Sequence, residues 1–172
     1  VLTALFLRDI IAVFGGIISL VKRMGAPRGA LAWLCLAAII ACIVLNALGT
    51  LAPLSETDAI TMHLVAPKEY VRAGRMLWLP DALDSPMIMG PHLLYTLIML
   101  LAPGAEASPA LLHFAVSALC LLWVWRFTRR FAGRRAAWAA AALFYTMPMI
   151  TKVTIAPMVD MFLALYVIAA LG

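Results

Sequence analysis

Acidic and imidazole side chains gather in one polar stretch of an otherwise apolar chain, and this stretch is where chemistry is most expected. Glu56 and Asp58 directly follow a long apolar run, and His63 comes five residues after Asp58. Carboxylates at the mouth of a membrane helix are costly unless they face water or a partner, so they indicate a functional site. The structural alternative is that Ser55 and Asp58 form a capping box that starts a helix.

Asp160 is the second candidate carboxylate, because it stands alone at the lip of another apolar run. Asp58 and Asp160 are suited to general-base chemistry or to holding a divalent metal, which His63 and His92 could join. The alternative for Asp160 is an ordinary acid at a helix N-terminus, where the helix dipole favours it.

Three basic residues follow the acidic pair at helical spacing. Lys68, Arg72 and Arg75 would share one face of a helix if that helix persists through Gly74. Such a stripe could hold a lipid phosphate, although contact with anionic head groups is the plainer interpretation.

The composition defines the class of protein. Hydrophobic residues make up 66% of the chain and charged residues only 12%. A spanning helix needs roughly 20 apolar residues, so we expect an all-α, polytopic integral membrane protein. The pI near 9.5 reflects basic residues in loops beside the spans. We therefore expect membrane lipids as partners and no nucleic acid.

The apolar runs predict where the chain crosses the membrane. Spans are expected at about 31–54, 110–125, 136–151 and 161–172, with a long outer loop over 55–108 that contains juxtamembrane helices. Residues 1–30 form part of an upstream span or an interfacial helix. The chain opens without a methionine and stops within an apolar run, so we expect the N-terminal fragment of a longer protein.

Charge asymmetry predicts the orientation. Two short loops hold three and five of the 13 basic residues and none of the eight acidic ones. These residues are Lys22, Arg23 and Arg28, then Arg126, Arg129, Arg130, Arg134 and Arg135. The positive-inside rule assigns both loops to the cytoplasm. Seven of the eight carboxylates then lie on the outer face, including both candidates.

Several short motifs together resemble a known family. They are Asp58-Ala59, His63-Leu64, Pro67-Lys68, Tyr70, Gly74-Arg75, Pro86, Leu94-Tyr95, the arginine-rich loop 126–135 and Val159-Asp160. In order and spacing they resemble the first outer loop and following spans of polyprenol-dependent glycosyltransferases with the C-type fold. That family includes protein O-mannosyltransferases and the lipid A aminoarabinose transferase. The resemblance covers about residues 31–172.

The resemblance implies transfer of a sugar from a polyprenyl-phosphate donor on the extracytoplasmic face, in the inner membrane if the protein is bacterial. Asp58 matches the first-loop aspartate, the candidate base or acceptor-positioning carboxylate, and Asp160 matches a second acidic position near the same cavity. His92 departs from the acidic or lysine residue common among relatives, and phosphate contact, metal binding and an interface role all stay open for it.

Two other functional classes fit an apolar chain of this kind. A transporter would hold its substrate near the bilayer midplane between broken helices, whereas the carboxylates here cluster at an outer lip. A non-catalytic membrane scaffold would carry the charged outer loop without using it.

Overall fold

The computed structural model describes residues 26–79, 89–103 and 107–171. All regular elements in these ranges are helical and none is a strand, which confirms the predicted all-α class. They are α2 (Ala30–Leu51), the π-helical turn η1 (Ala59–His63), α3 (Val65–Ala73), α4 (Met89–Leu101), α5 (Ser108–Thr146), α6 (Pro148–Ile155) and α7 (Asp160–Leu171). Most of the predicted upstream segment 1–30, the motif residue Pro86, and Asp81, Asp84 and Glu106 lie outside the described residues.

Two helices, α2 and α5, are long and apolar enough to cross a membrane, and α6 with α7 makes a third crossing if this bent pair is one broken span. The surface of α2 fits that role, because its large apolar side chains are exposed, Leu34 to 68%. The helix ends at Leu51, three residues before the predicted boundary at Leu54. Ala52 precedes Pro53 and is extended (φ −71°, ψ 155°), as proline requires of the residue before it.

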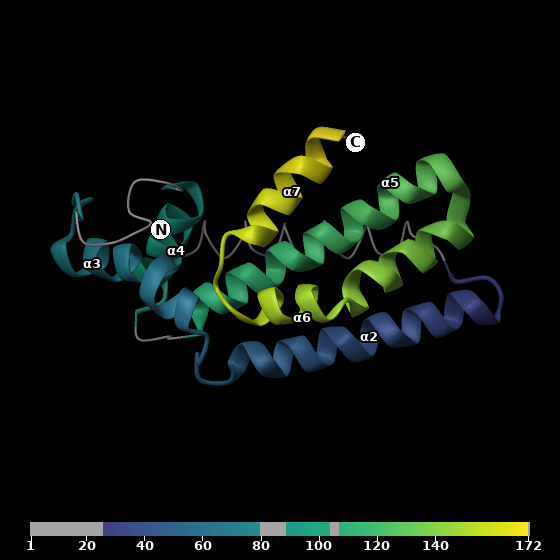
Figure 1. The fold of residues 1–172 in the computed structure, drawn as a ribbon, viewed down its shortest axis with the longest axis horizontal. Helices are drawn as coiled ribbons and strands as arrows, with labels where there is room; N and C mark the ends of the chain where they lie inside the picture. The colour runs from purple at the N-terminus through teal and green to yellow at the C-terminus, as the bar shows by residue number, and fades with distance from the viewer. Residues whose placement is uncertain (1–25, 80–88, 104–106, 172) are drawn as a thin grey trace, which may run out of the picture.

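A glycine divides α5 into two arms. Gly133 has φ 78° and ψ 178°, a backbone conformation that is essentially restricted to glycine. Figure 1 shows the chain reversing there, so that the second arm runs back beside the first. The reversal falls inside the arginine-rich segment between the two spans expected at 110–125 and 136–151.

The chain breaks again before and after α6. Met147 is extended, and Pro148 opens α6 at a position that needs no backbone N–H. The helix continues to Ile155, so Lys152 is helical and the helical segment extends four residues beyond the predicted boundary at 151. After residues 156–159, α7 departs at 116° to α6.

Two apolar clusters hold the elements together. The first joins α2 to both arms of α5 through residues that include Ile39, Trp125 and Tyr145. The second joins η1, α4, the first arm of α5, α6 and α7, with Tyr95 and Phe162 among its members. Helix α2 also approaches α6 closely, because a Cβ atom built on Gly49 would lie 3.0 Å from Cγ2 of Ile155.

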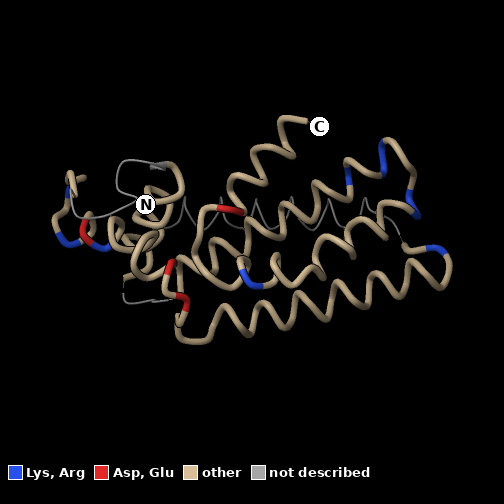
Figure 2. The backbone as a smooth tube through the Cα atoms, in the orientation of Figure 1, with Lys and Arg blue, Asp and Glu red and all other residues tan. Residues whose placement is uncertain are grey.

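The two arginine-rich segments lie at one end of the fold, away from the described acidic residues. Figure 2 shows acidic positions toward one end, before and within α3 and at the start of α7, whereas the arginines before α2 and around the α5 reversal lie at the other end. This arrangement is the one that the two basic loops of the sequence predict. Lys152 of α6 and the three basic residues in and directly after α3 are exceptions, since they lie toward the acidic end; the three are Lys68, Arg72 and Arg75.

The reversal at Gly133 generates a prediction about stability. Gly133→Ala should destabilise the protein by about 1–3 kcal/mol, because a Cβ atom strains this backbone although no atom lies within 4 Å of it. Thermal unfolding of the detergent-solubilised protein, followed by tryptophan fluorescence, measures the effect. Gly90→Ala is the matched control, because Gly90 is helical and equally uncrowded. Equal unfolding temperatures for the two variants would contradict the role given to Gly133.

Candidate functional site

The polar stretch after α2 begins a helix at a different residue from the one the sequence suggests. The first intrahelical hydrogen bond runs from the Ile60 N–H to the Glu56 carbonyl at 3.2 Å, so Glu56 rather than Ser55 is the N-cap. Asp58 is already helical and its side chain makes no capping hydrogen bond. The capping-box interpretation of Ser55 and Asp58 is therefore wrong. The Asp58 carboxylate is exposed and available to other groups.

The helix widens immediately after Asp58. Residues Ala59–His63 form a π-helical turn, in which the Leu64 N–H bonds the Ala59 carbonyl at 3.0 Å. Pro67 gives a physical reason, because in a continuous α-helix its ring would clash with the carbonyl of His63, four residues earlier. Such turns are rare and frequently occur at functional sites.

The π turn brings two histidines together. His63 and His92 are both buried, and Nδ1 of His63 lies 3.4 Å from Nε2 of His92. Sequence analysis nominated both as metal ligands with Asp58. Among the described residues, however, no group of three His, Cys, Asp or Glu side chains could hold a metal ion. The donor set within these ranges therefore does not fit the expected divalent metal site.

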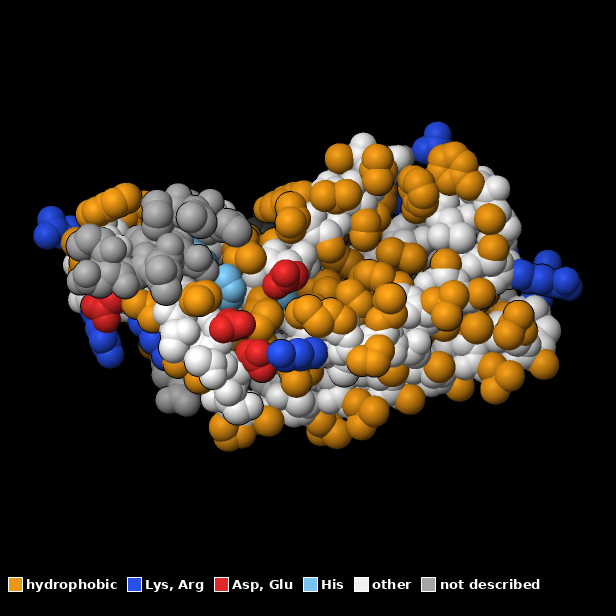
Figure 3. Space-filling view, viewed as in Figure 1, with side chains coloured by type: hydrophobic (Ala, Val, Ile, Leu, Met, Phe, Trp, Pro, Cys, Tyr) orange, Lys and Arg blue, Asp and Glu red, His pale blue; other side chains and the backbone are white. Residues whose placement is uncertain are grey.

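The acidic residues converge from two distant parts of the sequence. Ala59, next to Asp58, packs in the same apolar cluster as Met158 and Met161, which flank Asp160. Asp160 is exposed and is the first residue of α7. Figure 3 shows carboxylates gathered on one face, beside a histidine and in contact with a cationic side chain.

The cation is Lys152, which sequence analysis did not nominate. Its Nζ lies 3.0 Å from Oε1 of Glu56, which joins α6 to the start of the helical segment that follows α2. No ion pair within the described ranges involves Asp58 or Asp160, so Lys152 compensates only one of the three carboxylates. The sequence could have indicated Lys152, because it is a single lysine within an apolar segment.

A buried tyrosine fixes the link between α6 and α7. The Tyr95 hydroxyl donates a hydrogen bond to the Met158 carbonyl, and its oxygen lies 2.8 Å from Nδ1 of His113. Because the hydroxyl has one proton, Nδ1 of His113 must donate to the tyrosine oxygen. Burial raises the pKa of Tyr95 above its usual range, and the charge of Asp160 adds to the effect. Tyr95 is therefore a neutral donor that positions the segment before Asp160.

The basic stripe does not extend as the sequence suggested. Helix α3 ends at Ala73, and Gly74 is left-handed with φ 66°, so Arg75 leaves the helical face of Lys68 and Arg72. All three basic residues are exposed. Arg72 bonds Glu69 at 2.6 Å, within its own helix. No ion pair in the described residues links the three to the carboxylates at η1 and α7.

Comparisons with protein-family models, with curated proteins and with solved structures find no match to this chain.

The Tyr95 contacts predict a stability effect. Tyr95→Phe should destabilise the protein by about 1–3 kcal/mol, because the Met158 carbonyl and the His113 N–H lose a buried partner. Thermal unfolding in detergent is the measurement, with Tyr166→Phe as the control, since Tyr166 lies on α7 and is 59% exposed. If Tyr95→Phe unfolds at the wild-type temperature, the hydroxyl does not hold the link.

Proposed function

We propose that this chain forms the N-terminal part of the transmembrane domain of a glycosyltransferase with the C-type fold. The enzyme transfers a sugar from a polyprenyl-phosphate donor to a lipid, glycan or protein acceptor on the extracytoplasmic face of a bacterial inner membrane. The observation that carries the proposal is the convergence of Asp58 and Asp160, two exposed carboxylates without an ion-pair partner in the described ranges. They lie away from the end that holds the arginines before α2 and around the α5 reversal.

The proposed chemistry needs a proton acceptor. The hydroxyl oxygen of the acceptor attacks the anomeric carbon of the donor sugar, and its proton passes to the carboxylate of Asp58. The bond between the anomeric carbon and the phosphate oxygen breaks, and polyprenyl phosphate leaves with the electron pair. Asp58 suits the role of base because it is exposed and makes no capping hydrogen bond. Asp160, on the same face, orients the acceptor.

The departing phosphate gains negative charge, which a nearby cation stabilises. Lys152 is the basic residue joined to this cluster, and Glu56 holds it by the 3.0 Å contact. In this proposal the three exposed basic residues Lys68, Arg72 and Arg75 contact anionic lipid head groups and not the donor phosphate. His63 and His92 form a buried pair behind the carboxylates and give the π turn its support.

The apolar surface near the carboxylates suits a lipid-linked donor. Met149 of α6 and Leu163 of α7 are each 64% exposed, and these helices flank the link that leads to Asp160. Figure 3 shows apolar side chains in the hollowed surface beside the acidic groups. A polyprenyl chain lying there would bring its phosphate to the polar edge.

A transporter is the second candidate, because one observation favours it. Helices α6 and α7 form a pair bent by 116°, and discontinuous helices build the substrate sites of many transporters. Uptake by vesicles that contain the purified protein, without any sugar transfer, would favour this class over the transferase.

Replacement of the carboxylates tests the catalytic assignment in the full-length protein. Asp58→Asn and Asp160→Asn should each lower sugar transfer from a polyprenyl-phosphate donor, Asp58→Asn by about 10²- to 10⁴-fold, the usual contribution of a general base. Rates are normalised to monodisperse protein extracted in detergent. Glu69→Gln is the control and should stay within about twofold of wild type, because Glu69 pairs with Arg72 on α3. Asp58→Asn with more than about half of wild-type activity would refute the base assignment.

Orientation in the membrane is tested independently of activity. Single cysteines replace Met76 and Phe131, which are 54% and 69% exposed, in a background without Cys35, Cys42 and Cys120. An impermeant maleimide applied to spheroplasts should label position 76 and spare position 131, because the arginine-rich segment faces the cytoplasm. Both positions should react after permeabilisation. The reverse pattern would put the carboxylates in the cytoplasm.

A further inference from the structure

A cavity lies at the end of the fold opposite the carboxylates. Its volume is about 230 Å³, and it is lined by Arg28, Ala32, Arg134, Arg135 and Trp138. These residues come from the link before α2, the first turn of α2 and the beginning of the second arm of α5. A single buried water needs a cavity volume of only about 10–15 Å³, so this cavity can hold a polyatomic group.

Two glycines bring the arginines to this cavity. Gly29 (φ 92°) turns the chain between Arg28 and α2, and Gly133 (φ 78°) turns it immediately before Arg134. Trp138 follows Arg134 by one helical turn and therefore lies on the same face of the second arm. Ala32 is buried, and its side chain is too small to fill the cavity.

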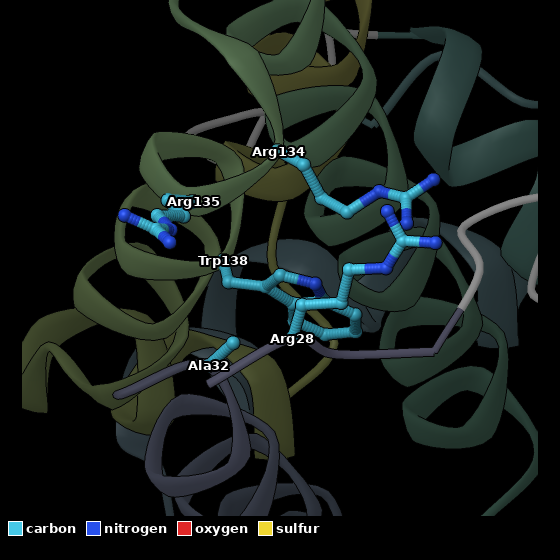
Figure 4. A pocket seen from close by; sticks show the side chains of 5 residues that line it. All are labelled: Arg28, Ala32, Arg134, Arg135 and Trp138. Carbon is cyan, nitrogen blue, oxygen red and sulfur yellow. The ribbon is translucent and has the colours of Figure 1, made fainter. Parts of the chain in front are cut away.

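The electrostatics of the cavity call for an anion. No ion pair within the described ranges involves Arg28, Arg134 or Arg135. Figure 4 shows the guanidinium groups of Arg28 and Arg134 on the same side of Trp138. Like charges gathered in one cavity repel each other, and an anion between them would remove that penalty. The first turns of α2 and of the second arm also supply backbone N–H groups that favour negative charge.

Trp138 adds a buried donor that lacks an acceptor. Its side chain lines the cavity, the residue is only 5% exposed, and its Nε1 has no hydrogen-bond partner. Buried polar groups in folded proteins nearly always have a partner. An indole N–H can only donate, so the missing group is an acceptor. Arginine forks and one further N–H together match the oxygens of a phosphate group.

The surroundings indicate where that phosphate comes from. Trp33 and Phe131 are exposed near the cavity-lining segments, to 57% and 69%, and aromatic side chains of this kind are typical of the head-group layer. Basic pockets between spanning helices on the cytoplasmic side bind anionic lipid head groups. The volume is below the about 300–1,000 Å³ of sites for whole small molecules, so a head-group phosphate fits and the acyl chains stay outside.

We propose that Arg28, Arg134 and Trp138 form a binding site for the phosphate ester of an anionic membrane lipid, at the end of the fold opposite the proposed catalytic carboxylates. The site does not depend on the proposed glycosyl transfer, because its residues and its ligand are separate from that reaction.

Binding of dioctanoyl phosphatidylglycerol to the full-length protein in zwitterionic detergent tests the site, by calorimetry. Arg28→Gln and Arg134→Gln should each weaken binding by at least about fivefold, the effect of one basic contact with a lipid phosphate. Trp138→Phe keeps the ring and removes the donor, so it should weaken binding about tenfold. The matched control is Arg126→Gln, which removes the same charge from the same end. Arg126 lies 5.6 Å from the Trp123 ring and does not line the cavity, so its replacement should change binding less than twofold.

Three outcomes would overturn the proposal. Equal weakening by Arg126→Gln and Arg134→Gln would mean that diffuse surface charge attracts the lipid. Wild-type binding in all of the cavity variants would remove the site. Inorganic phosphate that binds as tightly as the lipid, at the same residues, would mean that the site takes free phosphate instead of a membrane lipid.

Discussion

Helices in an apolar medium must satisfy their backbone hydrogen bonds internally, and this constraint governs where the chain is allowed to break. The breaks after α2, after α3, within α5 and before α6 occur at or beside Pro53, Gly74, Gly133 and Pro148. These residues either lack a backbone donor or tolerate a left-handed backbone, so each break needs little compensation. The polar side chains of interest lie beside such breaks or on the segment between α2 and α4.

The position of the polar side chains beside helix breaks explains why the two ends of the molecule differ in chemistry. At one end, the α6–α7 link and the π turn bring carboxylates, Lys152 and two histidines together. At the other end, two glycine turns expose arginines around a cavity. The apolar helices between them carry no charged residue that joins the two groups, so each end can act without the other.

Sequence alone predicted the helical class and the grouping of the two arginine-rich segments at one end, because both follow from composition and from the order of apolar and charged segments. It could not predict the contacts that shape the candidate site. The pairing of Glu56 with Lys152 depends on how α2 and α6 pack, and that packing depends on the close approach at Gly49. His63 and His92 were nominated together as possible metal ligands, but nothing in the sequence indicated their direct contact, which is a tertiary one. A metal-ligand set is likewise defined in space and not along the chain, and within the described residues no group of three His, Cys, Asp or Glu side chains forms one.

The π turn at Ala59–His63 also sets the rotational phase between two neighbouring stretches of helix. In an α-helix each residue advances the chain by about 100° around the axis. The π turn closes on the fifth residue instead of the fourth, so Asp58 has a different rotational phase relative to α3 from the one that a continuous α-helix would give it. The length of this five-residue turn, and not the identity of its side chains, thus determines which way the carboxylate faces.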